Sequence, residues 1–198
     1  IYDANGIWLC TRLREMDCEV VQYQTAGDDQ SKIADEIREA WKEADLILTT
    51  GGVSVGEKDL LPGVIENLTG NVLFHGIQVK PGMPTMLSVV KGTPVLSLSG
   101  NPFAVEALFE VLAGGYLTDM EASRYLQKNQ MKILKQTFVK TGKMKRIVKG
   151  RCDESGVYLP QIQKNGQLKN GIGSNCLVIF PEGERTYTEG EAVRVIRI

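Results

Sequence analysis

Residues 46–59 read Leu-Ile-Leu-Thr-Thr-Gly-Gly-Val-Ser-Val-Gly-Glu-Lys-Asp, and this stretch decides what kind of fold the chain adopts. Its apolar start predicts a buried strand, and its glycines predict a loop whose backbone can come close to a ligand. Hydroxyl side chains and successive backbone N–H groups suit an anion, and Asp59 adds a carboxylate beside them. The combination fits a phosphate-bearing ligand held with a divalent cation, while the same glycines also suit an ordinary strand-to-helix turn.

A second loop of the same kind, Ser99-Gly100-Asn101-Pro102, follows the apolar run 94–98. Asn101 is suited to cap a helix and Pro102 to begin it, so a helix is predicted over 101–117. The first turn of such a helix attracts anions through its exposed N–H groups and its dipole. A purely structural helix can carry the same cap. Two such loops after strands favour a ligand site, because open α/β sheets bind ligands at the carboxyl ends of their strands.

The first 126 residues alternate between helix and strand patterns. Helices are predicted from Asp3 or Asn5 onward, over 31–44 and over 60–68, and strands over 18–23, 44–50, 72–79, 85–90 and 93–98. Ile33, Ile37 and Trp41 recur at helical spacing, which indicates a helix face packed on a core. Alternation of this kind predicts an α/β domain with a parallel sheet covered by helices.

From residue 127 onward the pattern changes to short strand-like runs separated by glycine-rich turns. These runs cover 137–141, 146–152, 157–162, 176–180 and 192–198. Their close spacing predicts a small antiparallel barrel or sandwich. We therefore expect two domains, 1–126 and 127–198, and we expect the second to be structural or to bind a partner.

The composition excludes several classes of protein. The 198 residues are 42% hydrophobic and carry a net charge of −1, so charge gives no case for binding nucleic acid. No apolar run approaches the ~20 residues of a membrane span. The four cysteines form no C-x-x-C pair and His75 is the only histidine, so we expect reduced thiols, no zinc site and a cytoplasmic location. The first residue is Ile1 rather than Met, which indicates a piece of a longer protein.

Four motifs together resemble the molybdopterin molybdenumtransferase family, which includes MoeA and the E domain of gephyrin. They are Gly-Gly-Val-Ser-Val-Gly-Glu-Lys-Asp at 51–59, Lys-Pro-Gly-Met-Pro at 80–84, Ser-Leu-Ser-Gly-Asn-Pro at 97–102 and Gly-Ser-Asn-Cys-Leu-Val-Ile-Phe-Pro-Glu-Gly at 173–183. The resemblance runs along essentially the whole chain. It implies a three-layer α/β/α domain like that of MogA, apparently without its first strand, followed by a small β-barrel domain.

The resemblance also implies an enzyme of molybdenum cofactor biosynthesis. Such an enzyme inserts molybdate into adenylylated molybdopterin with release of AMP, uses Mg²⁺ and works as a homodimer. Asp28 and Asp59 fall on acids that the family uses around magnesium and molybdate, and Lys80 falls on a lysine suited to an oxyanion. Cleaving a phosphoanhydride depends mainly on charge neutralisation and positioning. The implied ligand-binding residues are Gly51, Gly52, Ser54, Gly56, Ser99, Gly100, Asn101 and Pro102.

This chain departs from the family's pattern in three ways. Met83 stands where the family often has lysine, and Gly76 falls near a second family lysine. The family's upstream segment is missing, and its first strand would pair with residues 20–25. We therefore expect the chain alone to be a binding fragment of an enzyme.

Two other functions remain open. One is a molybdopterin adenylyltransferase of the MogA type, and the other is a non-enzymatic scaffold like the E domain of gephyrin. The Val53-Ser54-Val55 sequence and the tail 127–198 favour the insertase over the adenylyltransferase.

Overall fold

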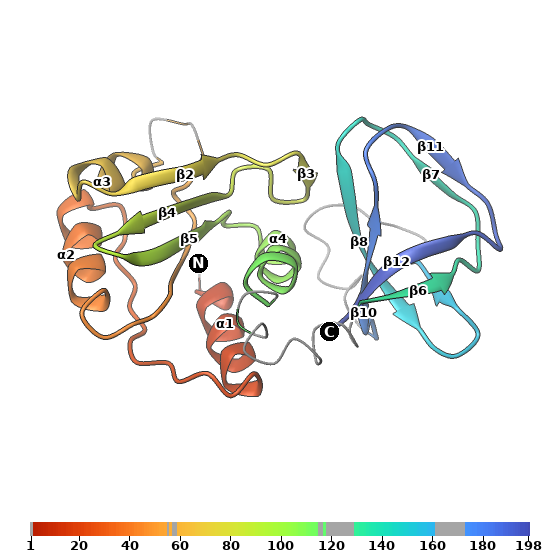
Figure 1. Cartoon of the computed structure of the whole chain (residues 1–198), viewed down its shortest axis with the longest axis horizontal. Coiled ribbons are helices and arrows are strands. Elements are labelled where there is room, and N and C mark those ends of the chain that lie inside the picture. The colour runs from red at the N-terminus through yellow and green to blue at the C-terminus, as the bar shows by residue number, and fades with distance from the viewer. Residues whose placement is uncertain (1, 55, 57–58, 115–116, 118–128, 161–172) are drawn as a thin grey trace. The chain divides into compact units, whose positions relative to one another are not determined.

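The structure is a computed structural model, shown in Figure 1. The chain divides into two compact units. The structure describes residues 2–54, 56, 59–114, 117, 129–160 and 173–198. One unit contains residues 1–77 and 82–106, and the other contains residues 78–81 and 107–198. The expected boundary at 126–127 lies outside the described residues, so the division into domains 1–126 and 127–198 stays a prediction.

The first unit has an α/β fold. Its strands are β1 (Ile47–Thr50), β2 (Asn71–His75), β4 (Met86–Val90) and β5 (Thr93–Leu98), in the sheet order β1-β5-β4-β2. Its helices are α1 (Ala4–Glu15), α2 (Gln30–Ala40), α3 (Leu61–Asn67) and the start of α4 (Pro102–Leu108). A π-helix, η1 (Phe109–Ala113), continues α4. The helix predicted over 101–117 is therefore confirmed over residues 102–113, and its winding changes from α to π at Phe109.

The sheet is mixed, so the prediction of a parallel sheet is wrong for one of its four strands, β4, which runs opposite to β1, β5 and β2. Only β1 and β5 pair in parallel, while β4 pairs antiparallel with both β5 and β2. The cause is the two-residue turn between β4 and β5, where Lys91 has φ 53° and Gly92 has φ 92°. Two successive positive φ angles are typical of a tight hairpin turn, which returns the chain beside the strand it has just left.

The strand predicted over residues 18–23, and its pairing through residues 20–25, are also wrong. Residues 18–27 form no strand. A strand needs a neighbour for its backbone groups, and among the described residues β1 pairs only with β5. Side chains hold this segment instead. Gln22 donates to Glu36 of α2 at 2.8 Å, and the Tyr23 hydroxyl donates to Asp3 at the start of α1 at 2.9 Å.

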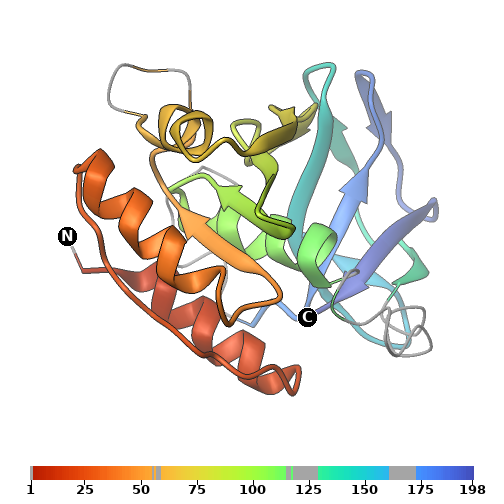
Figure 2. The same cartoon turned by 60° about the vertical axis from the view of Figure 1, so that its left-hand side comes forward.

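Helices α2 and α3 pack on the sheet through one apolar cluster, and Figure 2 shows α2 (orange) from the side and α3 (gold) nearly end-on. Ile37 of α2 and Ile65 of α3 belong to this cluster together with Ile47 and Val95 of the sheet. The opposite face of β5 is covered as well, since Leu96 and Leu98 are 4% and 0% exposed. A strand buried on both faces is typical of a sheet between two layers.

The second unit is built almost entirely of strands. These are β3 (Val79–Lys80), β6 (Asn129–Ile133), β7 (Phe138–Lys140), β8 (Lys145–Cys152), β9 (Val157–Tyr158), β10 (Cys176–Phe180), β11 (Arg185–Tyr187) and β12 (Ala192–Arg197). The main sheet has the order β3-β8-β10-β12-β6, with β9 on β8 and a separate ribbon of β7 and β11. The sequence predicted β7, β8, β10, β12 and the start of β9, but it missed β6, β11 and the contribution of β3. The last residues of the predicted 157–162 strand lie outside the described residues.

The strands of the second unit close into a small barrel. A bridge between Leu134, directly after β6, and Val157 of β9 completes the circuit through β8, β10 and β12. Its interior contains Phe180, whose ring stacks on Phe138 at 4.5 Å between centroids. The interior also contains Cys176, and burial raises the pKa of its thiol. This cysteine therefore stays protonated and belongs to the core.

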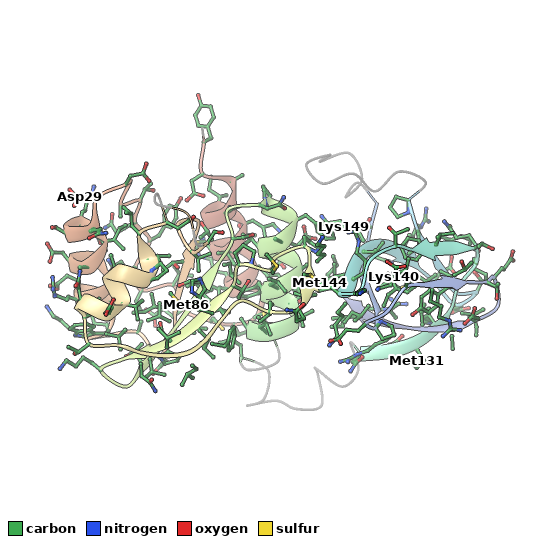
Figure 3. All side chains as sticks on the ribbon, turned by 90° about the horizontal axis from the view of Figure 1, so that it is seen from above. Asp29, Met86, Met131, Lys140, Met144 and Lys149 are labelled. Carbon is green, nitrogen blue, oxygen red and sulfur yellow. The ribbon has the colours of Figure 1, made fainter. Side chains whose placement is uncertain are left out.

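Lys140 at the end of β7 is the buried lysine of this unit, and it is labelled in Figure 3. It is 2% exposed, and its Nζ donates to the carbonyl oxygens of Gly142 at 2.7 Å and Gly183. The ammonium thereby ties the turn after β7 to the turn before β11. Its role is structural, because both acceptors are backbone groups of adjoining turns.

We expect Lys140→Met to lower the free energy of unfolding by about 1–2 kcal/mol, because two backbone carbonyls lose a charged donor. Lys143→Met is the matched control, since Lys143 lies in the same turn with an exposed side chain. The control should stay within about 0.5 kcal/mol of wild type. Urea unfolding of the three proteins measures both effects. Equal losses in the two variants would contradict the role given to Lys140.

Candidate ligand-binding site

The two predicted loops lie side by side at the carboxyl ends of β1 and β5. Parallel pairing matches Thr50 with Leu98, so both strands end at the same level. The N–H of Gly51 then donates to the carbonyl of Leu98 at 2.9 Å. A Cβ on Gly100 would lie 3.6 Å from Cα of Gly51, so the two backbones nearly touch. The structure therefore brings together the two loops that the sequence singled out.

The first loop depends on its two leading glycines. Gly51 and Gly52 have φ angles of +83° and +63°, a region that other residues adopt only with strain. The carbonyl of Gly52 accepts from the N–H of Leu61 at 3.0 Å, and Val53 buries its side chain in the core with 1% exposed. The loop is thus anchored at both ends, and Ser54 follows directly after the buried Val53.

The second loop begins a helix as predicted. Asn101 caps α4 by accepting from the N–H of Ala104 at 3.1 Å, and Pro102 is the first helical residue. The carbonyl of Gly100 accepts from the side chain of Asn5 in α1 at 3.0 Å. Both ends of this loop are therefore fixed by hydrogen bonds within the first unit. The ligand contacts expected of Ser99, Gly100, Asn101 and Pro102 stay predictions.

Three hydroxyl groups at this end of the sheet are buried and unpaired. The side-chain oxygens of Thr49, Ser97 and Ser99 have no hydrogen-bond partner in the described part of the chain. Thr49 and Ser97 are register partners on β1 and β5, and each lies two residues beyond a member of the core cluster, Ile47 or Val95. Successive residues of a strand alternate between its faces, so these hydroxyls extend the helix-covered face of the sheet to the loops.

Unpaired buried hydroxyls are costly, because each loses its bonds to water without a replacement. Their gathering at the two loops indicates that a ligand or an ordered water completes their hydrogen bonds. Ser99 was predicted from the sequence as a ligand-binding residue, whereas Thr49 and Ser97 were given no role. The available signal was a polar residue near the end of each otherwise apolar strand.

The acidic residues are placed separately along the first unit. Asp59 closes the end of the first loop, since its Oδ2 accepts from the N–H of Gly56 at 3.0 Å and its own N–H donates to the Gly56 carbonyl at 2.9 Å. Asp28 is exposed and directly precedes Asp29, which caps α2. Among the described residues no group of three or more His, Cys, Asp or Glu side chains could hold a metal ion. The metal-binding roles of Asp28 and Asp59 therefore stay predictions.

Lys80 lies on β3 and its side chain is exposed. Because β3 belongs to the second unit, the expected place of Lys80 beside the loops of the first unit stays a prediction. Met83, where the family often has lysine, is 46% exposed. Gly76 has φ +94° and donates its N–H to the carbonyl of Thr85 at 2.8 Å. This chain therefore uses a turn-forming residue near the place of the second family lysine.

Comparison with known proteins identifies the family of this chain. Residues 1–119 match the family described as the probable molybdopterin binding domain. The molybdopterin molybdenumtransferase of Staphylococcus aureus is 28% identical over 201 residues, covering 99% of this chain and 48% of that protein. The chain thus spans about half the length of the curated relatives that it matches.

Solved structures of proteins of molybdopterin and molybdenum cofactor biosynthesis resemble this chain along essentially its whole length. The molybdopterin biosynthesis MoeA protein of Pyrococcus horikoshii superposes with a TM-score of 0.82 and 28% identity over 100% of this chain and 48% of that one. A molybdenum cofactor biosynthesis protein of Pyrococcus furiosus, at 24% identity, has a TM-score of 0.76 over 99% of this chain and 65% of its own. The latter likeness shows the fold alone.

The fold is that of an α/β domain whose candidate ligand-binding loops meet at the carboxyl ends of its parallel strands. The chain belongs to the molybdopterin-binding domain family. No helix in the described ranges is long and apolar enough to cross a membrane.

We expect Thr49→Val to leave the free energy of unfolding unchanged or to raise it by up to about 1 kcal/mol, because valine keeps the shape and removes an unpaired buried hydroxyl. Thr85→Val is the matched control. The Thr85 hydroxyl is equally hidden but donates to the Gly82 carbonyl at 2.7 Å, so its removal should cost about 1–2 kcal/mol. Chemical unfolding without ligand compares the two. A clear loss of stability in Thr49→Val would show that its hydroxyl already has a partner.

Proposed function

We propose that the protein to which this chain belongs inserts molybdate into adenylylated molybdopterin and releases AMP. The chain would supply the pterin-binding unit and the small barrel. The observation that carries the proposal is the match of residues 1–119 to the molybdopterin-binding family. The structure adds that the two loops meet beside hydroxyls that have no hydrogen-bond partner among the described residues. The relatives named molybdopterin molybdenumtransferase and MoeA, which align along nearly the whole chain, support the choice of reaction.

In this proposal the two loops bind the phosphate and pterin end of the ligand. Gly51 and Gly52 keep the backbone free of side chains, while Ser54 and Gly56 follow in the same loop. On the other side Ser99 presents a hydroxyl, and the capped start of α4 presents backbone N–H groups. These donors are neutral, so they fix the position of an anion but do not neutralise its charge.

Charge neutralisation is assigned to Mg²⁺ held through Asp28 and Asp59, and to Lys80. Mg²⁺ is commonly held by one or two carboxylates together with substrate phosphates and waters, so two aspartates suffice. Asp59 fits this role, since a carboxylate that accepts one N–H from Gly56 has a second oxygen for a cation. When bound, the cation would supply polarisation of a phosphoryl oxygen. Lys80 would attract molybdate through its charge.

The proposal includes a homodimer and a cytoplasmic location. All four cysteines are free thiols, which suits a reducing compartment. Since the chain spans about half of its relatives' length, the remaining part of the longer protein would complete the active cleft.

We expect Asp59→Asn in the full-length protein to reduce molybdate insertion by at least about 100-fold, because it removes a charge that the cation or oxyanion step needs. The asparagine oxygen can still accept the Gly56 N–H, so the loop and the affinity for adenylylated molybdopterin should stay within about tenfold of wild type. Asp59→Ala removes both the charge and the bond. The assay follows molybdenum cofactor formation and AMP release, with ligand affinity measured separately.

Two results would contradict the proposal. Turnover of Asp59→Asn near the wild-type rate would show that this carboxylate does not serve the reaction. Formation of adenylylated molybdopterin from ATP and molybdopterin, without molybdate insertion, would establish the adenylyltransferase instead. A full-length protein that performs neither reaction would favour the scaffold.

A further inference from the structure

His75, the only histidine of the chain, contacts the first ligand loop from the far edge of the sheet. Its Nε2 lies 2.7 Å from the carbonyl oxygen of Val53, across a sequence separation of 22 residues. His75 is the last residue of β2, and β1 and β2 are the two edges of the first unit's sheet. Since β2 runs antiparallel to β4, and β4 antiparallel to β5, β2 ends at the same side of the sheet as β1 and β5.

The loop that leaves β1 therefore crosses the whole end of the sheet. It is tied to β5 through the bond from Gly51 to Leu98, and to β2 through the bond between Val53 and His75. A third bond ties the Gly52 carbonyl to Leu61 at the start of α3. Three consecutive loop residues are thus each held by a different element. Only the bond to His75 uses a side chain, so it is the one that a substitution can remove without changing the backbone.

The chemistry of the contact determines which ring nitrogen of His75 carries a hydrogen toward Val53. A backbone carbonyl can only accept, so Nε2 of His75 carries the hydrogen and donates it. The side chain of Val53 is 1% exposed, which anchors this residue in the core but leaves the orientation of the following peptide to its hydrogen bonds. The donor holds the peptide between Val53 and Ser54 in one orientation. That peptide also contains the N–H of Ser54, which is a predicted ligand-binding residue.

We propose that His75 is a positioning residue of the ligand site: its Nε2–H holds the Val53 carbonyl so that the N–H and hydroxyl of Ser54 face the ligand. The inference rests on the proposed function for the identity of the ligand, but the hydrogen bond itself does not. A ring that merely covered the surface would need no donor at this position. A variant that keeps the ring but lacks the donor therefore distinguishes a positioning role of His75 from a packing role.

The experiment compares His75→Phe with His75→Gln in the 198-residue chain. Phenylalanine keeps an aromatic ring and lacks the donor, while the Gln amide nitrogen can donate from nearly the same place as Nε2. Leu73→Phe is the control, because this exposed residue lies on the same strand. Affinity for adenylylated molybdopterin should fall about fivefold to tenfold in His75→Phe, as expected for one lost hydrogen bond. It should stay within about twofold in His75→Gln and in the control.

Two spectroscopic measurements test the bond independently of the ligand. Every imidazole signal of ¹⁵N-histidine-labelled chain comes from His75, and it should report a hydrogen on Nε2. The ¹H–¹⁵N chemical shift of the Ser54 amide, whose peptide carbonyl accepts the bond, should change in His75→Phe and stay near its wild-type value in His75→Gln. A neutral ring with its hydrogen on Nδ1 alone, or equal affinity in His75→Phe and wild type, would overturn the inference.

The remaining outcomes are also decisive. If His75→Gln binds as weakly as His75→Phe, the ring rather than its donor matters and the positioning role is wrong. If the wild-type full-length protein does not bind adenylylated molybdopterin, the proposed function fails. The chemical shift of the Ser54 amide then still shows whether His75 positions the loop.

Discussion

The parallel pairing of β1 with β5 is the constraint on which the site depends. Its register places Thr50 beside Leu98, so two loops that are far apart in the sequence leave the sheet at the same level. The bond from Gly51 to Leu98 continues this pairing one residue beyond the strand. A shift of β1 by one residue would move Thr49 to the opposite face of the sheet, because side chains alternate along a strand. Its hydroxyl would then leave the face that it shares with Ser97.

The same register creates a conflict between folding and binding. The positions of Thr49 and Ser97 continue the apolar rows that begin with Ile47 and Val95, where a core residue would be more stabilising. Hydroxyl groups without partners oppose folding there, and the two positive φ angles of Gly51 and Gly52 add backbone entropy lost on folding. Such costs are expected if these residues form the proposed ligand site, where function rather than stability determines the residue types. The apolar cluster beneath α2 and α3 offsets them.

Sequence patterns predicted the parts of the structure that local chemistry determines. Asn101 followed by proline identified the start of α4, and the glycine pair identified the first loop, because a cap or a positive φ depends on the residue itself. The antiparallel β4 was missed because its direction depends on the short turn at Lys91 and Gly92. The predicted strand over 18–23 failed because a strand exists only with a neighbour. His75 could not be found from local patterns, since its importance comes from a contact across the sheet.

The balance of charges in the first unit limits what its loops can do by themselves. Among the described residues, the donors of the loops are backbone N–H groups and hydroxyls, while Asp59, the charged residue of the first loop that the structure describes, is negative and bonded to Gly56. Asp59 would therefore repel a phosphate or molybdate unless a cation lay between them. Met83 and Gly76 occupy places where family lysines would reduce this repulsion. Under the proposed function, a positive charge would come from a bound metal ion, from Lys80 or from Lys58, which the sequence places in the first loop. Positioning an anion and neutralising its charge are thus different requirements, and the described neutral donors of the two loops suit the first of them.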